Sequence, residues 1–390
     1  MSPEFFDGND IRLLESGSDF FPAMIQAVDA ASNEVHLETY IFADDSTGQN
    51  VAAALVRAAQ RQVSVRVLID GFGADGFLSG LGVALVNSGA EVLAYRPDKS
   101  RGRWRRSQLR RLHRKLVVID GTVAFVGGIN ILDDFDDGKI RSPRFDYAVR
   151  IEGPLVGKIH GAMRHVWRLV RWAKLRQRPP PPPQAFSSAV PRSAGMRAAF
   201  VIRDNFRHRH DIENAYLVAM SEARRDIIIA NAYFLPGRKF RQALYKAAQS
   251  NIQVTLLLQG RVEHALQHYA TQYLYRRLLG AGVRIFEYHR SFLHAKVAVI
   301  DDRWATVGSS NIDPFSLLLA REANVVVSDC RFAGSLRFSL NKAMVDGATE
   351  VRLADLQQQT MIYRFLAPLA YAAVRLLLNI TGYAKSFNKR

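Results

Sequence analysis

Cysteine is almost absent from this chain of 390 residues, since Cys330 is the only one. A single thiol excludes a disulfide framework and is compatible with a reducing compartment. Cys330 follows the apolar, strand-like run "ANVVVSD". We therefore expect it to be a packed and inert side chain.

Long apolar runs are lacking as well. No stretch reaches the ~18 uncharged apolar residues that a transmembrane helix needs. The opening "MSPEFFDGND" has neither the basic nor the apolar region of a secretory signal. From these absences we expect no ordinary transmembrane helix and no cleaved signal.

Acidic residues are outnumbered, with 36 Asp and Glu against 53 Lys and Arg, so the formal net charge is +17. Such a charge attracts phosphate-rich partners, which are either nucleic acid or an anionic lipid surface. Charge alone does not choose between them. The remaining composition, 48% hydrophobic and 23% charged, is that of an ordinary globular protein.

The chain contains two copies of one pattern. Segments that begin at Asn33 and Arg225 each read as strand, loop, amphipathic helix and strand, with Tyr40 and Tyr233 at the same place. Short β-branched runs separated by helical patterns predict an α/β class with a mixed or parallel sheet in each half. The predicted strands are 35–42, 63–69, 116–119, 227–234, 254–258 and 297–300.

Five consecutive prolines, Pro179 to Pro183, separate the two copies and cannot continue a helix. We therefore predict a first lobe over 1–175, which a basic helix closes, and a linker over 176–196. A second lobe follows over 197–350, and a tail over 351–390.

The sharpest signal is a histidine motif that occurs once in each half. It reads "LHRKLVVIDGTVAFVGGIN" over residues 112–130 and "LHAKVAVIDDRWATVGSSN" over residues 293–311. Packing does not explain six positions that recur at the same offsets. They are His113, Lys115, Asp120, Gly127, Gly128 and Asn130, then His294, Lys296, Asp301, Gly308, Ser309 and Asn311.

The motif carries phosphate chemistry. Residues two apart on a strand share a face, so docking the copies brings two His-Lys pairs to one pocket. Two ammonium groups would hold a phosphate, and Asn130, Asn311 and the turn N–H groups at Gly128 and Ser309 would add neutral donors. One imidazole attacks phosphorus while the other protonates the leaving alkoxide. This chemistry needs no metal and no cofactor.

The repeats resemble the signature of the phospholipase D superfamily over most of residues 10–345. "VGGIN", "FDYAVRIEGP" and "VGSSNIDPFSLLLAREANVVVSD" are similar to segments of its cardiolipin synthase branch. The resemblance implies two pseudo-symmetric α/β/α lobes with one active site between them. It assigns catalysis to both histidines and both lysines of the motifs.

The resemblance also implies a carboxylate downstream of each histidine that orients the ring. Asp146 follows His113, and Glu322 follows His294. Asp120 and Asp301 belong to the motif and are counted with its catalytic residues. Each ends a strand just before a turn, and this position suits structural hydrogen bonding.

The branch implies a phosphatidyltransferase that forms cardiolipin by passing a phosphatidyl group from a histidine to phosphatidylglycerol. The donor is a second phosphatidylglycerol or a phosphatidylethanolamine. Without transmembrane helices, the chain resembles the shorter, peripheral members, placed on the cytoplasmic face of the bacterial inner membrane.

The alternative is a phosphodiesterase of the same fold, either a phospholipid hydrolase or a nuclease. Nucleic acid is less favoured, because no groove of alternating aromatic and basic residues is evident. The oligomeric state stays open.

Two segments concentrate features of lipid binding. "RGRWRRSQLRRLHR", residues 101–114, has seven arginines and runs into His113, so we interpret it as the entry rim, with Trp104 at the lipid interface. As a helix, the tail carries one stripe on an otherwise apolar surface. It fits either an interfacial helix or a last helix packed on the core. The stripe consists of Arg364, Pro368, Tyr371, Arg375 and Asn379.

Overall fold

The computed structural model of the chain describes residues 3–74, 76–96, 110–135, 142–175, 195–204, 207–262, 265–313, 320–358 and 361–380. The proline run and Trp104, together with most of the arginine-rich segment, lie outside the described residues.

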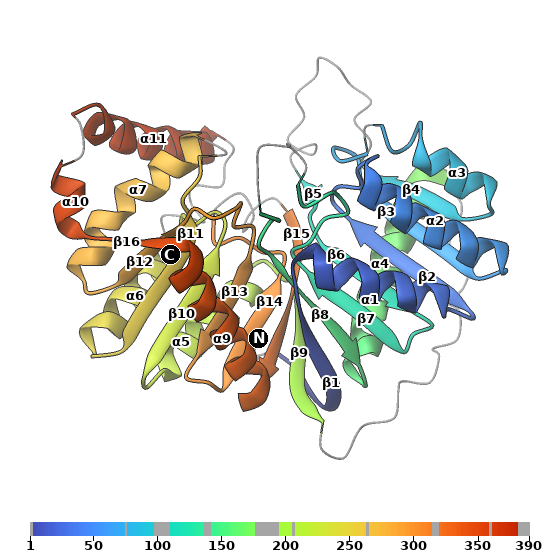
Figure 1. The fold of residues 1–390 in the computed structure, drawn as a ribbon, viewed down its shortest axis with the longest axis horizontal. Coiled ribbons are helices and arrows are strands. Elements are labelled where there is room, and N and C mark those ends of the chain that lie inside the picture. Colours follow the sequence, from blue (N-terminus) through green and yellow to red (C-terminus); the bar gives the residue numbers. More distant parts are fainter. Residues whose placement is uncertain are drawn as a thin grey trace.

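The first lobe lies on the right of Figure 1, in blue and green. It comprises β1 (Phe5–Glu15), α1 (Ser16–Asp29), β2 (Glu34–Thr39), α2 (Ser46–Gln60), β3 (Ser64–Asp70), α3 (Leu81–Asn87), β4 (Glu91–Tyr95), β5 (Arg111–Leu112), β6 (Lys115–Ile119), β7 (Val123–Gly127), β8 (Tyr147–Glu152) and α4 (Leu155–Leu175).

The second lobe, in yellow and orange, repeats this order. It comprises β9 (Met196–Arg203), α5 (Asp211–Glu222), β10 (Asp226–Asn231), α6 (Arg238–Gln249), β11 (Gln253–Gln259), α7 (Ala265–Gly280), β12 (Arg284–Tyr288), β13 (Lys296–Ile300), β14 (Trp304–Gly308), β15 (Ala320–Ser328), α9 (Cys330–Gly347) and β16 (Ala348–Val351). The tail adds α10 (Leu353–Gln358) and α11 (Met361–Ile380).

One mixed sheet runs through both lobes. Its centre is the antiparallel pair of β1 and β9. Outward from that pair the order is β8-β7-β6-β2-β3-β4 on one side and β15-β14-β13-β10-β11-β12 on the other, with β16 added at the second edge. The two halves therefore follow the same plan about a pseudo-two-fold axis, which confirms the predicted fold class.

Burial explains why the predicted strands were readable in the sequence. β2 and β10 pair in parallel with β3 and β11, and helices cover both faces. β10 is accordingly an apolar run, DIIIAN, whereas β2, EVHLET, alternates polar and apolar residues although all six are buried. All six predicted strands are confirmed, and the predicted basic helix is α4. The prediction for Cys330 is wrong, because this residue is exposed at the first position of α9.

The lobes also share a core. One buried apolar cluster contains Leu155 and Ile159 of α4, Leu336 of α9, and strand residues from both lobes. Separate clusters lie under α1 and α2 in the first lobe and under α5, α6 and α7 in the second. Because the middle cluster crosses the lobe boundary, the two motifs are held at a fixed separation.

The tail helix α11 packs on the second lobe. Ala370 and Val374 are buried in its core cluster, and the Tyr371 ring stacks on Tyr273 of α7 at 4.6 Å. Within the described ranges, we find no helix that combines the length and the apolar character needed to cross a bilayer.

Candidate active site

The two histidine motifs meet at the lobe boundary through a reciprocal exchange of backbone hydrogen bonds. The N–H of His113 donates to the carbonyl of Arg321 in the second lobe at 3.0 Å. The N–H of His294 donates to the carbonyl of Phe145 in the first lobe at 2.8 Å. Each motif is therefore anchored by the segment that follows the other.

The orienting carboxylates are crossed between the lobes. Nδ1 of His113 lies 3.0 Å from Oε1 of Glu322, and Nδ1 of His294 lies 2.6 Å from Oδ2 of Asp146. The expectation that each histidine pairs with the carboxylate of its own half is wrong. Both expected carboxylates contact a histidine ring, but each contacts the histidine of the opposite lobe. The reason is that the segment before each motif strand lies beside the segment that carries the other lobe's carboxylate.

These contacts decide which ring nitrogen is available. The side chains of His113 and His294 are 16% and 19% exposed, whereas Glu322 and Asp146 are buried. With Nδ1 bonded to a carboxylate, Nε2 is the nitrogen left for a substrate. A carboxylate on Nδ1 fixes the tautomer and stabilises the imidazolium when it forms.

Burial favours the neutral form of both imidazoles. It lowers the pKa of His113 below its ordinary value, against the opposing effect of Glu322. Burial and then the charge of Lys296 lower the pKa of His294 to about 4. Lys296 also lowers the pKa of His113 from across the boundary. The two motifs therefore act on each other electrostatically.

Both lysines bend back onto their own motif. Nζ of Lys115 donates to the carbonyl of His113 at 2.9 Å, and Nζ of Lys296 donates to the carbonyl of His294. Burial lowers the pKa of Lys115 to about 7. A bound phosphate would replace the lost hydration of such an ammonium group, so the site is suited to an anion.

Lys296 also holds Asp146 ionised. Its Nζ lies 3.5 Å from Oδ2 of Asp146 and 2.8 Å from Nδ1 of His294. Burial acts to raise the pKa of Asp146, but Lys296 and His294 outweigh it and keep that pKa below its ordinary value. An ionised Asp146 accepts hydrogen bonds, so Nδ1 of His294 carries the proton and donates it.

Gly128 and Ser309 do not serve as the expected phosphate donors. Their N–H groups donate to strand carbonyls, those of Tyr147 and Ala323, both at 3.0 Å. A Cβ at Gly128 would lie 2.5 Å from the Asp146 carboxylate, so only glycine leaves room for that group. The hydroxyl of Ser309 instead donates to Glu322 at 2.5 Å. Both residues therefore position the orienting carboxylates, while the buried Asn130 and Asn311 stay candidates for phosphate binding.

Asp120 and Asp301 do not reach the histidines. They lie at the opposite end of β6 and β13, roughly 20 Å along the strand. Each carboxylate accepts hydrogen bonds from three consecutive backbone N–H groups before or at the start of a neighbouring strand. The donors are Ser32, Asn33 and Glu34 in the first lobe and Arg224, Arg225 and Asp226 in the second.

Two residues that contact the first motif or the segment before it were not singled out from the sequence as site residues. The Tyr40 ring packs 4.8 Å from the His113 ring, and Nζ of Lys115 lies 5.4 Å from the Tyr40 centroid. Burial raises the pKa of Tyr40 to about 12, so the phenol stays neutral. Asp70, whose pKa burial raises to about 6, accepts the N–H of Leu112 at 2.7 Å and so fixes the segment before His113.

The predicted equivalence of Tyr40 and Tyr233 is wrong by one residue. Glu38 pairs with Leu116 in the first lobe, and Ala230 pairs with Val297 in the second. Counting from these positions, the counterpart of Tyr40 is Ala232. A tyrosine that follows a strand in both halves does not fix how the two halves align residue by residue. The pairing of the strands does.

The comparisons with known proteins agree with this site. The family model described as "Cardiolipin synthase, PLD-like domain" matches residues 24–135 and 216–343, one segment in each lobe. The chain belongs to this PLD-like cardiolipin synthase family. It is 36% identical to cardiolipin synthase B of Escherichia coli (strain K12), over 98% of this chain and 92% of that protein. It is 38% identical to cardiolipin synthase B of Salmonella typhi, over 97% and 90%.

A solved structure shares the fold of this family member. The crystal structure of phosphatidylserine synthase from Haemophilus influenzae superposes with a TM-score of 0.69 at 13% identity, covering 97% of this chain and 94% of that one. At this identity the likeness concerns the arrangement of the lobes alone.

Proposed function

We propose that the chain is a phosphatidyltransferase that makes cardiolipin from phosphatidylglycerol. The observation that carries the proposal is the crossed pair of histidine–carboxylate contacts, which places two oriented imidazoles and two buried lysines at one boundary. Membership of the cardiolipin synthase family supports the choice of a phospholipid over another phosphodiester.

The reaction divides into two displacements. Binding of the anionic phosphate favours uptake of a proton at Nε2 of His294. Nε2 of His113 then attacks phosphorus and the bond to the leaving alkoxide breaks, while His294 donates that proton to the oxygen. His294 then takes a proton from the glycerol hydroxyl of phosphatidylglycerol. The resulting alkoxide attacks the phosphohistidine, the P–N bond breaks, and cardiolipin leaves. Lys115 and Lys296 stabilise the charge on the phosphoryl oxygens.

The test uses the full chain with vesicles of phosphatidylglycerol, alone or mixed with phosphatidylethanolamine, and resolves the lipids by mass spectrometry. We expect cardiolipin, with free glycerol or ethanolamine identifying the donor. Phosphatidic acid as the sole product would show a hydrolase instead. Cleavage of single-stranded DNA at a comparable rate would show that the nuclease alternative holds.

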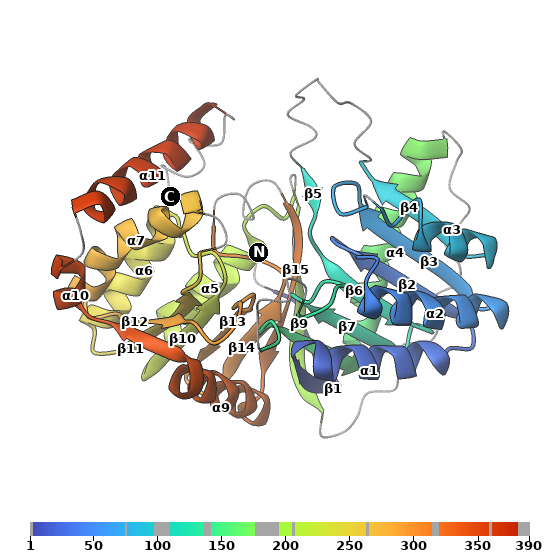
Figure 2. The same cartoon turned by 45° about the horizontal axis from the view of Figure 1, so that its top comes forward.

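We also propose that α11 docks this enzyme on the cytoplasmic face of the bacterial inner membrane. One side of α11 packs on α7, while Leu369 and Leu376 on the other side are 67% and 59% exposed. Figures 1 and 2 both place α11 on the same edge as β5, which leads into His113. An apolar helix face on the same edge of the molecule as β5 fits a lipid surface.

Substitution tests this docking better than deletion, because removing α11 would expose the core around Val374. We expect Leu369→Ser with Leu376→Ser to weaken binding to phosphatidylglycerol vesicles in a flotation assay, with the melting temperature unchanged. Phe338→Ser, at a 73% exposed position on α9, is the control. Equal flotation of all three proteins would contradict the role of α11.

A further inference from the structure

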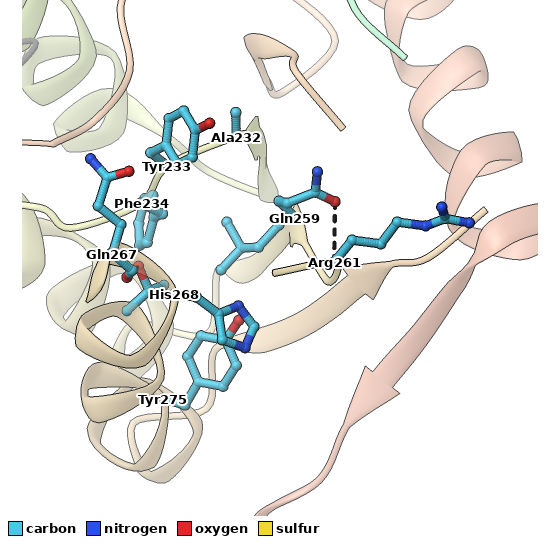
Figure 3. A pocket seen from close by; sticks show the side chains of 10 residues that line it. Ala232, Tyr233, Phe234, Gln259, Arg261, Gln267, His268 and Tyr275 are labelled. Carbon is cyan, nitrogen blue, oxygen red and sulfur yellow. Dashed lines mark hydrogen bonds between the residues drawn. The ribbon is translucent and has the colours of Figure 1, made fainter. Parts of the chain in front are cut away.

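The two lobes differ in the hollows that lie beside their strands. In the second lobe, the hollow that Ala232, Gln259 and α7 line (Figure 3) has a volume of about 20 Å³. That is room for about one water molecule. In the first lobe, a groove between β4 and α4 has a volume of about 670 Å³, within the roughly 300–1,000 Å³ of typical small-molecule sites. The groove, rather than the hollow, therefore has room for part of an organic ligand.

The groove follows an open edge of the sheet. β4 is the last strand on the first-lobe side, and no strand of the described ranges pairs with its outer edge. In the second lobe, β16 pairs with the corresponding edge of β12. Val92 and Ala94 of β4 line the groove. The groove therefore lies along an edge that the second lobe covers with its own chain.

The wall that α4 contributes is apolar. Its lining residues recur at the i, i+3, i+4 and i+7 spacing of one helix face and are Val166, Leu169, Val170 and Ala173. Leu169 is 44% exposed, and Leu78, which lines the groove from the segment before α3, is 42% exposed. Large apolar side chains that are exposed together in a groove are typical of a binding surface.

Positive charge gathers at the end of the groove near Tyr95. Nε of Arg321 donates to the Tyr95 hydroxyl at 3.3 Å, and the Arg96 guanidinium lies 5.5 Å from the centroid of the Tyr95 ring. Lys174, exposed at the end of α4, lines the groove as well. No acidic residue occurs among the described residues of the lining. Guanidinium groups bind phosphate through paired hydrogen bonds, so this end of the groove suits a phosphate anion.

The groove lies on the side of the molecule where we propose that α11 docks. Its residue Arg321 pairs with Leu112 of β5, the strand that leads into His113. Figure 2 shows the carboxyl end of α4, in green, on the same edge as β5 and α11. Trp172, near that end of α4, is 58% exposed, and exposed tryptophan is typical of the interface between water and bilayer. A bilayer that contacts α11 on the second lobe therefore also faces the groove on the first.

We propose that the groove binds one anionic phospholipid of the bilayer, with an acyl chain along α4 and the phosphate between Arg96 and Arg321. An apolar wall that ends at two guanidinium groups matches an apolar tail joined to a phosphate. Neither motif histidine nor motif lysine lines the groove, so the lipid held there is not the one that reacts. The site goes beyond the proposed transfer reaction and gives the first lobe its own contact with the membrane.

Photo-crosslinking tests this site directly. The probe is phosphatidylglycerol with a diazirine on one acyl chain, mixed into phosphatidylcholine vesicles with the full chain, and peptide mass spectrometry maps the labelled residues. We expect labels within residues 166–173 of α4, in addition to labels on α11. Arg96→Gln should lower the α4 label about tenfold relative to the α11 label, the effect of losing one hydrogen bond to a charged group. Leu169→Ser should lower the same ratio, because it places a hydroxyl in the apolar wall.

Arg171→Gln and Val86→Ser are the matched controls and should leave the ratio unchanged. Arg171 lies on α4 but pairs with Glu91 outside the groove, and Val86 is 54% exposed on α3. A label on α11 without a label on α4 overturns the proposal, and so does a ratio that neither groove variant changes. Equal α4 labels from phosphatidylglycerol and from phosphatidylcholine with the same diazirine chain also overturn it. No label on either helix would overturn this proposal together with docking through α11, whereas cardiolipin formation is measured separately and tests the proposed reaction.

Discussion

The two lobes fill one interior position in different ways. In the first lobe, the buried carboxylate of Glu38 accepts a 2.6 Å hydrogen bond from Arg114, which lies between the motif histidine and lysine. In the second lobe the equivalent residues are Ala230 and Ala295, and both belong to the apolar cluster shared by the lobes. The same backbone therefore accepts a buried ion pair or two methyl groups.

The two lobes therefore share a backbone arrangement without sharing every buried side chain. The histidines, lysines and carboxylates recur because both copies line one site. Tyr40 and the Glu38–Arg114 pair occur only beside the first motif. Only one imidazole can attack phosphorus in a turnover, so unlike surroundings for the two histidines fit unlike roles.

Removing one histidine at a time is the strongest way to break the symmetry. We expect His113→Ala and His294→Ala each to lower kcat by at least ~10³-fold. With an activated donor that needs no acid, His294→Ala should accumulate a phosphatidyl adduct on His113, and His113→Ala should form none. Mass spectrometry of trapped peptides reads the site, and an adduct on His294 in His113→Ala would reverse the assignment.

The ion pair offers a test of folding stability. Glu38→Ala leaves the Arg114 charge buried without its partner and should lower the free energy of unfolding by about 3–5 kcal/mol. The double variant Glu38→Ala with Arg114→Ala copies the second lobe and should lose clearly less, measured by urea denaturation. A double variant as unstable as Glu38→Ala would mean that the first lobe cannot adopt the interior of the second.

The crossed carboxylates predict crossed phenotypes. Glu322→Gln and Asp146→Asn should each lower kcat about 10²-fold. Glu322→Gln should resemble His113→Ala and slow adduct formation, while Asp146→Asn should resemble His294→Ala and let adduct build up. Rapid-quench measurement of the adduct separates the two steps. The opposite assignment of phenotypes would indicate pairing within each lobe.

The pKa of Lys115 predicts how kcat/KM changes at alkaline pH. Its pKa is lowered to about 7 by burial, so the ammonium is present below pH 7 and is lost above it. Because the ammonium binds the phosphate, kcat/KM should fall about tenfold per pH unit above pH 7. Lys115→Arg keeps its charge and should shift this fall to higher pH, whatever its absolute rate. The same alkaline fall in both proteins would exclude Lys115 as its source.

The smallest effect is expected from chelation. One lysine from each lobe already supplies the positive charge around the phosphate, so excess EDTA should leave cardiolipin formation unchanged. If EDTA abolishes activity and added zinc or magnesium restores it, the two lysines alone do not neutralise the phosphate.

The sequence by itself determined the repeat, the central strands, the basic helix α4 and the four motif residues His113, Lys115, His294 and Lys296. Each of these depends on local spacing: apolar runs mark buried strands, and fixed offsets mark a repeated motif. The resemblance to a known family also marked Asp146 and Glu322 as orienting carboxylates downstream of the histidines.

Only the tertiary structure decided which carboxylate serves which histidine. That choice depends on the pairing of β1 with β9 and on the docking of the lobes, and no spacing within one copy records either. The structure also placed Ala232 rather than Tyr233 opposite Tyr40, because a shift of one residue turns a side chain to the other face of a strand. The sequence motif identifies which side chains are present at the site. Which of them contact one another depends on contacts between residues far apart in the chain.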